Sequence, residues 1–182
     1  IELPTDYAIS SAENFASGAI KILNSLKIVD YVAFGAENKN ITTLNNIANV
    51  LYEEPKQYVS MLSHELDKGL SYAKARENAI LMYLNDIKRY ANVLNQSNNI
   101  LAIEYLKALK RQKSNIQPIT MKRKDSGYND SIIPVDSRFA SGSAIRNICQ
   151  STFDISLLQK FMPEHSYNLL EDSIKNGNVV KS

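Results

Sequence analysis

The sequence has few of the residues that build disulfide frameworks or zinc sites. Its 182 residues include one cysteine, Cys149, and two histidines, His64 and His165. A single cysteine excludes an intramolecular disulfide framework and suits a reducing, cytoplasmic setting. The histidines lie far apart and lack cysteine partners, which argues against a zinc site. Because no apolar run approaches the ~20 residues that span a bilayer, and no secretory leader pattern is found, we expect a cytoplasmic protein without a membrane partner.

Acidic residues are absent from one stretch that is rich in basic ones. Residues 107–124 contain no Asp or Glu but hold a third of the 21 Lys and Arg of the chain. These are Lys107, Lys110, Arg111, Lys113, Lys122, Arg123 and Lys124. Such a stripe can neutralise a nucleic-acid backbone or nucleotide phosphates. Basic residues also complement the C-terminal dipole of a helix, so composition leaves both interpretations open.

The pattern of apolar residues predicts an α/β protein with few strands. Residues 29–34 form a β-rich run that ends at Gly35, and residues 116–121 form a second one. The rest of the pattern is helical. The predicted helices span residues 7–26, 41–52, 55–68, 71–94 and 97–112, with another after Ser141 and one or two short ones within 157–175. This alternation favours a Rossmann-like fold with a parallel sheet.

The domain organisation follows from this order of elements. We expect one domain over residues 1–150, with a helical insertion at about 40–94, and a helical C-terminal extension over 151–182. Two strands are too few for a doubly wound sheet. The opening residues 1–4 also resemble the end of an apolar strand. We therefore expect further sequence upstream.

The most informative short motif is FASGSAIRNIC, residues 139–149. Ser141 and Ser143 flank Gly142, and Arg146 follows where a helix should begin. A helix N-terminus presents unpaired N–H groups and a positive dipole end, so it readily holds an anion. The motif therefore predicts a phosphate site. The alternative is a serine N-cap followed by a surface arginine.

Six blocks of the sequence, in order, resemble one protein family. They are IELPTDYAISSAENFASGAIKIL, VDYVAFGAE, KGLSYAKAREN, NNILAIEYLKALK, PITMKRKDSGYND and ASGSAIR. Over residues 1 to about 150 they are similar to the bacterial tRNA(Met) cytidine acetate ligases, of the HIGH-type nucleotidyltransferase superfamily. The resemblance implies a Rossmann-like nucleotidyltransferase that uses ATP, with Mg²⁺ on its phosphates, to convert acetate into acetyl-adenylate. The acetyl group would then pass to N4 of the wobble cytidine of elongator tRNA(Met).

The resemblance also implies which residues bind ATP. The ATP contacts would be Gly35, Asn98 or Asn99, Arg123, Ser141, Ser143 and Arg146. The candidate RNA contacts come from the basic stripe instead, and they are Lys107, Lys110, Arg111 and Lys113. A glycine at the end of a strand leaves room for adenine or ribose. An asparagine amide at a helix start can bond to nucleotide or cap the helix. Arginine can pair bidentately with phosphate.

One signature of the superfamily is missing from the chain. Neither His64 nor His165 lies in an H-x-G-H turn, whose histidines would stabilise charge on the α-phosphate as the adenylate forms. We leave the catalytic residues unassigned and assign no metal ligand. We also expect that residues 1–182 cannot form acetyl-adenylate on their own.

Two other functions stay open at this point. Another HIGH-type nucleotidyltransferase, acting on a small molecule, would use the same pocket and need no RNA. A non-catalytic RNA-binding module would use the basic stripe and bind no nucleotide. Dependence on tRNA distinguishes the first alternative, and thermal stabilisation by ATP distinguishes the second.

Overall fold

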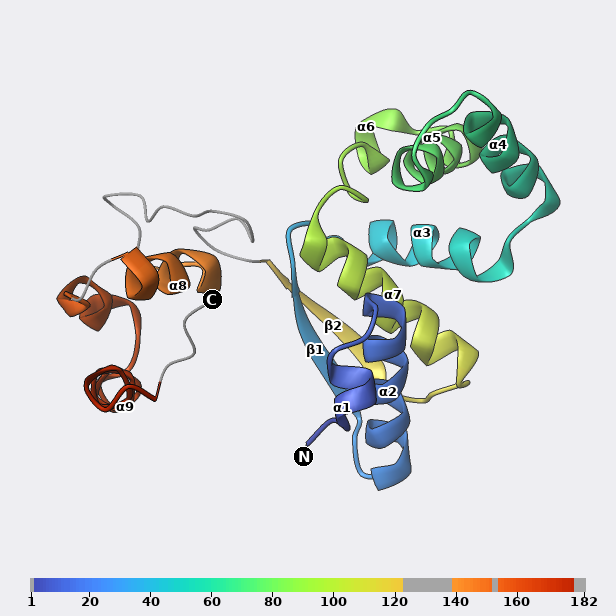
Figure 1. Ribbon diagram of the computed structural model, residues 1–182. Helices are drawn as coiled ribbons and strands as arrows, with labels where there is room; N and C mark the ends of the chain where they lie inside the picture. Colours follow the sequence, from blue (N-terminus) through green and yellow to red (C-terminus); the bar gives the residue numbers. More distant parts are fainter. Residues whose placement is uncertain (1, 123–138, 152–153, 179–182) are drawn as a thin grey trace. The chain divides into compact units, whose positions relative to one another are not determined.

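The computed structural model describes residues 2–122, 139–151 and 154–178. The chain divides into two compact units, Ile1–Lys122 and Arg123–Ser182 (Figure 1). Each unit has its own cluster of buried apolar side chains. The first unit holds both strands of the described chain and seven of its α-helices, and the second holds two α-helices and a 3-10 helix.

Two parallel strands form the sheet of the first unit. β1 (Tyr31–Ala36) pairs with β2 (Gln117–Lys122) along their whole lengths. Phe34 and Ala36 on one face are buried, whereas the alternate residues of β1 are exposed. The parallel α/β arrangement confirms the prediction, but the strands begin two residues and one residue later than expected. Gly35 therefore lies inside β1 and not after it.

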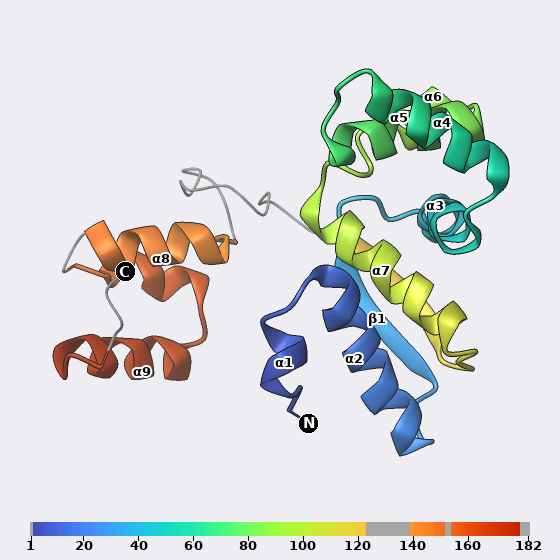
Figure 2. The ribbon, with the colours of Figure 1, turned by 45° about the vertical axis from the view of Figure 1, so that its right-hand side comes forward.

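Helix α7 is the central helix of the first unit. It spans Ser97–Arg111 and packs against α2 (Ala12–Leu26), α3 (Ile41–Glu53) and β1. Both ribbon views show α2 and α7 side by side next to the strands (Figures 1 and 2). The ring of Phe34 on β1 stacks on Tyr105 of α7, with 5.4 Å between the ring centroids. The buried face of the sheet is thus fixed to α7 by aromatic packing.

The N-terminal helix is shorter than the sequence predicted. The structure has α1 over Thr5–Ala8 and then α2, in place of one helix over residues 7–26. The side chain of Ser11 accepts a hydrogen bond from the backbone N of Asn14 at 3.4 Å and caps α2. The cap starts a new helix, so the predicted helix is divided in two although the pattern of apolar residues continues across the break.

Four helices lie between β1 and α7 in the sequence. They are α3 (Ile41–Glu53), α4 (Lys56–Asp67), α5 (Tyr72–Leu84) and α6 (Ile87–Tyr90). The predicted helix over 71–94 breaks where Asn85 adopts a left-handed φ of 50° and Asp86 caps α6. Leu44, Ile47 and Ile80 belong to the same buried cluster as Ile20 and Ile103. The insertion therefore shares the core of the first unit.

The second unit is helical. It contains α8 (Gly142–Ser151), a 3-10 helix η1 (Ser156–Phe161) and α9 (Glu164–Lys175). Apolar side chains of α8, including Ile148, pack against a buried cluster formed by Ile155, Leu158 and Tyr167. The two compact units divide after residue 122, and the domain boundary at 150 stays a prediction.

Candidate functional site

A pocket opens at the carboxyl ends of the two strands, where open parallel sheets bind ligands. Its volume is about 430 Å³. The segment after β1, the last residue of β2 and the start of α7 all contribute to its wall. Polar and charged lining residues include Glu37, Asn38, Lys39, Gln96, Asn99 and Lys122. The pocket therefore joins segments that lie far apart in the sequence.

The carboxylate of Glu37 connects the exit of β1 to the start of α7. Its Oε2 accepts a hydrogen bond from the backbone N of Asn99 at 2.8 Å, and its Oε1 accepts one from Asn98 Nδ2 at 2.6 Å. The residue before the helix, Gln96, makes no side-chain cap. A carboxylate is favourable here because the first N–H groups and the helix dipole attract negative charge.

Both asparagines that the sequence proposed for ATP are held by the segment after β1. Asn99 is 2% exposed, and its Oδ1 accepts a hydrogen bond from the backbone N of Asn38 at 2.8 Å. The side-chain amide of Asn98 donates a hydrogen bond to Glu37. Asn99 also lines the pocket. Their contact with nucleotide stays a prediction.

One other predicted ATP contact, Gly35, belongs to the first unit and lies near the same edge of the sheet. Gly35 is exposed, lies opposite Met121 in the strand register, and precedes Glu37 by two residues. Thr120 of β2 donates a hydrogen bond to the carbonyl of Lys39 at 2.9 Å, which links the second strand to the segment after β1. Arg123 lies outside the described residues.

The predicted serine turn forms the N-terminus of α8 in the second unit. The buried hydroxyl of Ser141 accepts a hydrogen bond from the backbone N of Ala144 at 2.9 Å, so this residue is a helix cap. Arg146 Nη2 donates to Ser143 Oγ at 3.1 Å. A Cβ at Gly142 would lie 3.2 Å from Arg146 Nη1, so glycine leaves room for the guanidinium. This places a cation at the positive end of a helix, an arrangement that an anion would stabilise.

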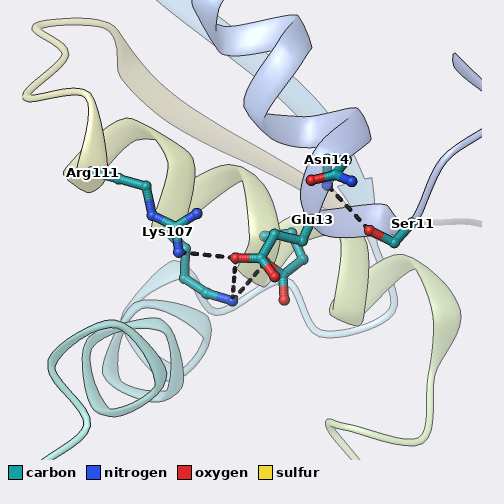
Figure 3. A network of polar contacts seen from close by, with 6 residues as sticks. Ser11, Glu13, Asn14, Lys107 and Arg111 are labelled. Atoms are coloured by element: carbon teal, nitrogen blue, oxygen red, sulfur yellow. Dashed lines mark hydrogen bonds and ion pairs between the residues drawn. The ribbon is translucent and has the colours of Figure 1, made fainter. Parts of the chain in front are cut away.

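Two of the predicted RNA contacts form ion pairs with carboxylates of the same chain (Figure 3). Arg111 Nη2 lies 2.9 Å from Glu13 Oε1, and Lys107 Nζ lies 2.7 Å from Glu104 Oε2 and 3.7 Å from Glu13 Oε1. The Lys107 side chain is only 11% exposed. The hydrogen bond from Arg111 lowers the pKa of Glu13. These four residues, here called the α2–α7 charge cluster, join the two helices.

The remaining basic residues of α7 have a different environment. Among the ion pairs of the described residues, none involves Lys110 or Lys113. Lys113 is exposed just after α7, at a left-handed φ of 50°. Both lie at the opposite end of the helix from Asn99. Their contact with RNA stays a prediction.

The two histidines and the metal-ligating residues do not gather into a site. His64 on α4 and His165 on α9 are both exposed. Within the described ranges, no group of three or more His, Cys, Asp and Glu side chains could hold a metal ion. In the same ranges, no helix has the length and apolar content needed to cross a membrane.

Sequence reasoning missed Glu37 and Asn38. Their partners lie 61 or 62 residues further along the chain, so no local pattern reveals the pairing. The available signal was position, because polar residues directly after a parallel strand lie at its ligand-binding edge. Glu37 stands there in the sequence block VDYVAFGAE.

Comparison with known proteins gives one consistent result. A family model described as HIGH Nucleotidyl Transferase matches residues 1–182. A tRNA(Met) cytidine acetate ligase of Clostridium novyi is 43% identical over 180 residues, which cover 99% of this chain and 44% of the relative. One of Caldanaerobacter subterraneus is 44% identical over 177 residues, covering 97% and 43%. The chain thus spans less than half the length of these curated relatives.

Solved structures agree with the sequence comparison. The crystal structure of Thermotoga maritima TmcAL in its apo form I matches with a TM-score of 0.86 and 33% identity, over 97% of this chain and 42% of that one. TmcAL bound with alpha-thio ATP matches with a TM-score of 0.79 and 33% identity, over 97% and 40%. The predicted α/β nucleotidyltransferase fold is confirmed by these matches.

Proposed function

This chain belongs to the HIGH nucleotidyl transferase family, and from that premise we propose that it forms part of a tRNA(Met) cytidine acetate ligase. The enzyme uses ATP to convert acetate into acetyl-adenylate and pyrophosphate. It then transfers the acetyl group to N4 of the wobble cytidine of elongator tRNA(Met). The observation that carries the proposal is the match of 97–99% of this chain to relatives of that name.

The pocket at the carboxyl ends of β1 and β2 supports the ATP-binding part of the proposal. A structural neighbour with the same fold was crystallised with alpha-thio ATP. Lys39 and Lys122 are exposed at the pocket and supply positive charge for phosphate oxygens. Asn99 supplies an amide at the same edge. We propose that Gly35, Asn98 and Arg123 also contact the nucleotide.

The N-terminus of α8 supports a role in phosphate binding. Ser143 and Arg146 present a hydroxyl and a guanidinium beside the first N–H groups of the helix, and such groups bind phosphate well. Ser141 caps the helix and would act by holding these groups in place. We propose that Mg²⁺ arrives bound to the ATP phosphates, and that the protein works in the cytoplasm.

Thermal stabilisation by ATP tests the proposal on the full-length protein. A ligand at a concentration of 100 times its Kd stabilises the folded state by about 2.7 kcal/mol. The wild-type Tm should rise with ATP, and Arg146→Ala and Arg123→Ala should lose most of that rise. Exposed Lys88→Ala, outside the pocket, serves as the control. An unchanged wild-type Tm at millimolar ATP would contradict ATP binding.

Product analysis then tests the reaction. The full-length enzyme should release pyrophosphate from ATP when acetate is present and should acetylate elongator tRNA(Met). Acyl transfer to a small molecule without any need for RNA would favour the other HIGH-type transferase. Binding of RNA without response to ATP would favour an RNA-binding module. Residues 1–182 contain no H-x-G-H turn, and we expect no pyrophosphate release from them alone.

A further inference from the structure

The segment after β1 carries a charged group that the proposed reaction leaves without a role. We propose that Glu37 is a positioning residue, which holds Asn98 and Asn99 in the orientation in which ATP meets them. This inference rests on the proposed function, because it takes the pocket to be the ATP site. Glu37 lines that pocket and reaches the first turn of α7 across 61 residues of sequence.

The carboxylate satisfies three donors at once. Besides Asn98 Nδ2 at 2.6 Å and the backbone N of Asn99 at 2.8 Å, it accepts a hydrogen bond from the backbone N of Asn98 at 3.4 Å. An ionised carboxylate offers only acceptors, so it matches three donors without conflict. An amide at position 37 would place an NH₂ group against one of them. The charge of Glu37 is therefore part of the fit.

A hydrogen bond from the segment after β1 also fixes which atom of Asn99 is available to a ligand. The backbone N–H of Asn38 can pair only with the amide oxygen of Asn99, and it does so at 2.8 Å. Asn99 is 2% exposed, so its amide has little freedom to rotate. No hydrogen bond from Asn99 Nδ2 to another described residue is found. Asn99 would thus serve as a donor to an acceptor atom of the nucleotide.

The same carboxylate occupies the helix end that would otherwise attract phosphate. The start of α7 has the unpaired N–H groups and positive dipole end that bind anions. With Glu37 there, phosphate oxygens are repelled from the start of α7 and attracted to Lys39 and Lys122. Glu37 would therefore set both the amide orientation and the direction of the triphosphate.

The affinity for ATP, measured by titration calorimetry on the full-length protein, tests this role. Glu37→Gln keeps the size of the side chain but removes its charge, and we expect ATP affinity to fall about tenfold, as for loss of charge-assisted hydrogen bonds. Glu37→Asp keeps the charge with a shorter reach and should lose less. Asp86→Asn is the matched control, because Asp86 also caps a helix N-terminus, that of α6, outside the pocket. Its ATP affinity should stay within about twofold of the wild type.

The conservative variant supplies the rescue. Glu37→Asp restores a charged acceptor for the same donors and should therefore bind ATP more tightly than Glu37→Gln. A lower Tm with unchanged ATP affinity in the folded Glu37→Gln protein would overturn the inference, since it shows a merely structural cap. Failure of the wild type to bind ATP would instead overturn the proposed function, and this inference with it. If Glu37→Gln does not fold, Glu37→Asp is measured instead, and an ATP affinity equal to that of the wild type would overturn the inference.

Discussion

The two ends of α7 are both tied to the rest of the first unit through carboxylates, but with opposite consequences. At the start of the helix, Glu37 binds backbone and side-chain N–H groups and leaves Lys39 and Lys122 available at the pocket. Near its end, Glu13 forms ion pairs with Arg111 and Lys107, and Lys107 also pairs with Glu104. One carboxylate organises a polar site, whereas the other removes positive charge from a surface.

This difference shows why a count of basic residues is a poor guide to a binding surface. The stripe over 107–124 contains no acidic residue in the sequence. In the folded chain, Glu13 reaches it from 94 residues before Lys107 and Glu104 from the preceding turn. Only cations without such partners can exchange their counterions for those of a nucleic acid at little cost.

Removal of Lys107 should have the largest effect, a loss of stability. It tests whether the ion pairs near the end of α7 are structural. Lys107→Ala leaves the carboxylate of Glu104, whose side chain is 6% exposed, without its ion-pair partner. We expect a loss of about 3 kcal/mol in the free energy of unfolding, as for other buried pairs. Urea denaturation measures it, with Lys113→Ala as an exposed control. Equal stability of the two variants would contradict the buried role of Lys107.

A change at the other end of α7 should reduce ligand binding more than stability. Asn99→Asp keeps the shape of the side chain but replaces the NH₂ donor with an acceptor and adds charge beside Glu37. We expect ATP affinity to fall at least tenfold, which corresponds to about 1.4 kcal/mol. Isothermal titration of the folded variant measures this. Unaltered affinity would mean that the nucleotide does not use this amide.

Charge reversal separates the two kinds of basic residue near the end of α7. Lys110→Glu with Lys113→Glu should weaken tRNA binding by about tenfold and reduce the dependence of log Kd on log salt by about one or two. The unpaired state of both lysines within the described chain is the reason. Filter binding at several salt concentrations measures the slope. Arg111→Glu should weaken tRNA binding less, because Arg111 is already paired with Glu13. An equal loss would contradict this explanation.

The smallest expected effect concerns acid stability. Arg111 lowers the pKa of Glu13 below its ordinary value of 4.5, so the folded state favours the ionised form. The resulting stability is present above pH 4.5 and is lost as the pH falls through the lowered pKa of the folded state. Because Glu13 is 46% exposed, the difference from Glu13→Gln should be below about 1 kcal/mol at neutral pH. The Tm values of the wild type and Glu13→Gln should converge in acid. A Tm difference that does not change with pH would contradict a stabilising Glu13–Arg111 ion pair.

Local patterns predicted the elements well but not their breaks. The strands were placed within two residues, because each is a short β-rich run bounded by polar residues. The breaks at Ser11 and at Asn85 depend on a side-chain cap and a left-handed residue, which the apolar stripe does not record. The packing of α8 with η1 and α9 was also missed, since it depends on which apolar faces meet.

Part of the candidate pocket was predictable from residues that begin a helix. Asn98 and Asn99 were proposed from their place at the start of α7 and from the family resemblance, and Asn99 lines the pocket. Glu37 was not proposed, because its partners come from a distant part of the chain. The partners of Lys107 were missed for the same reason. Long-range pairing of charges is decided by tertiary structure, and a single sequence does not reveal it.

Hydrogen exchange along α7 tests most directly whether the pocket at the ends of the strands binds ATP. Backbone amides of residues 36–40 and 97–101, which surround the pocket, should exchange more slowly when the full-length protein is saturated with ATP. Amides of residues 108–113, at the other end of the helix, should exchange at unchanged rates. Protection confined to residues 108–113, or absent from 36–40 and 97–101 at saturating ATP, would contradict this account.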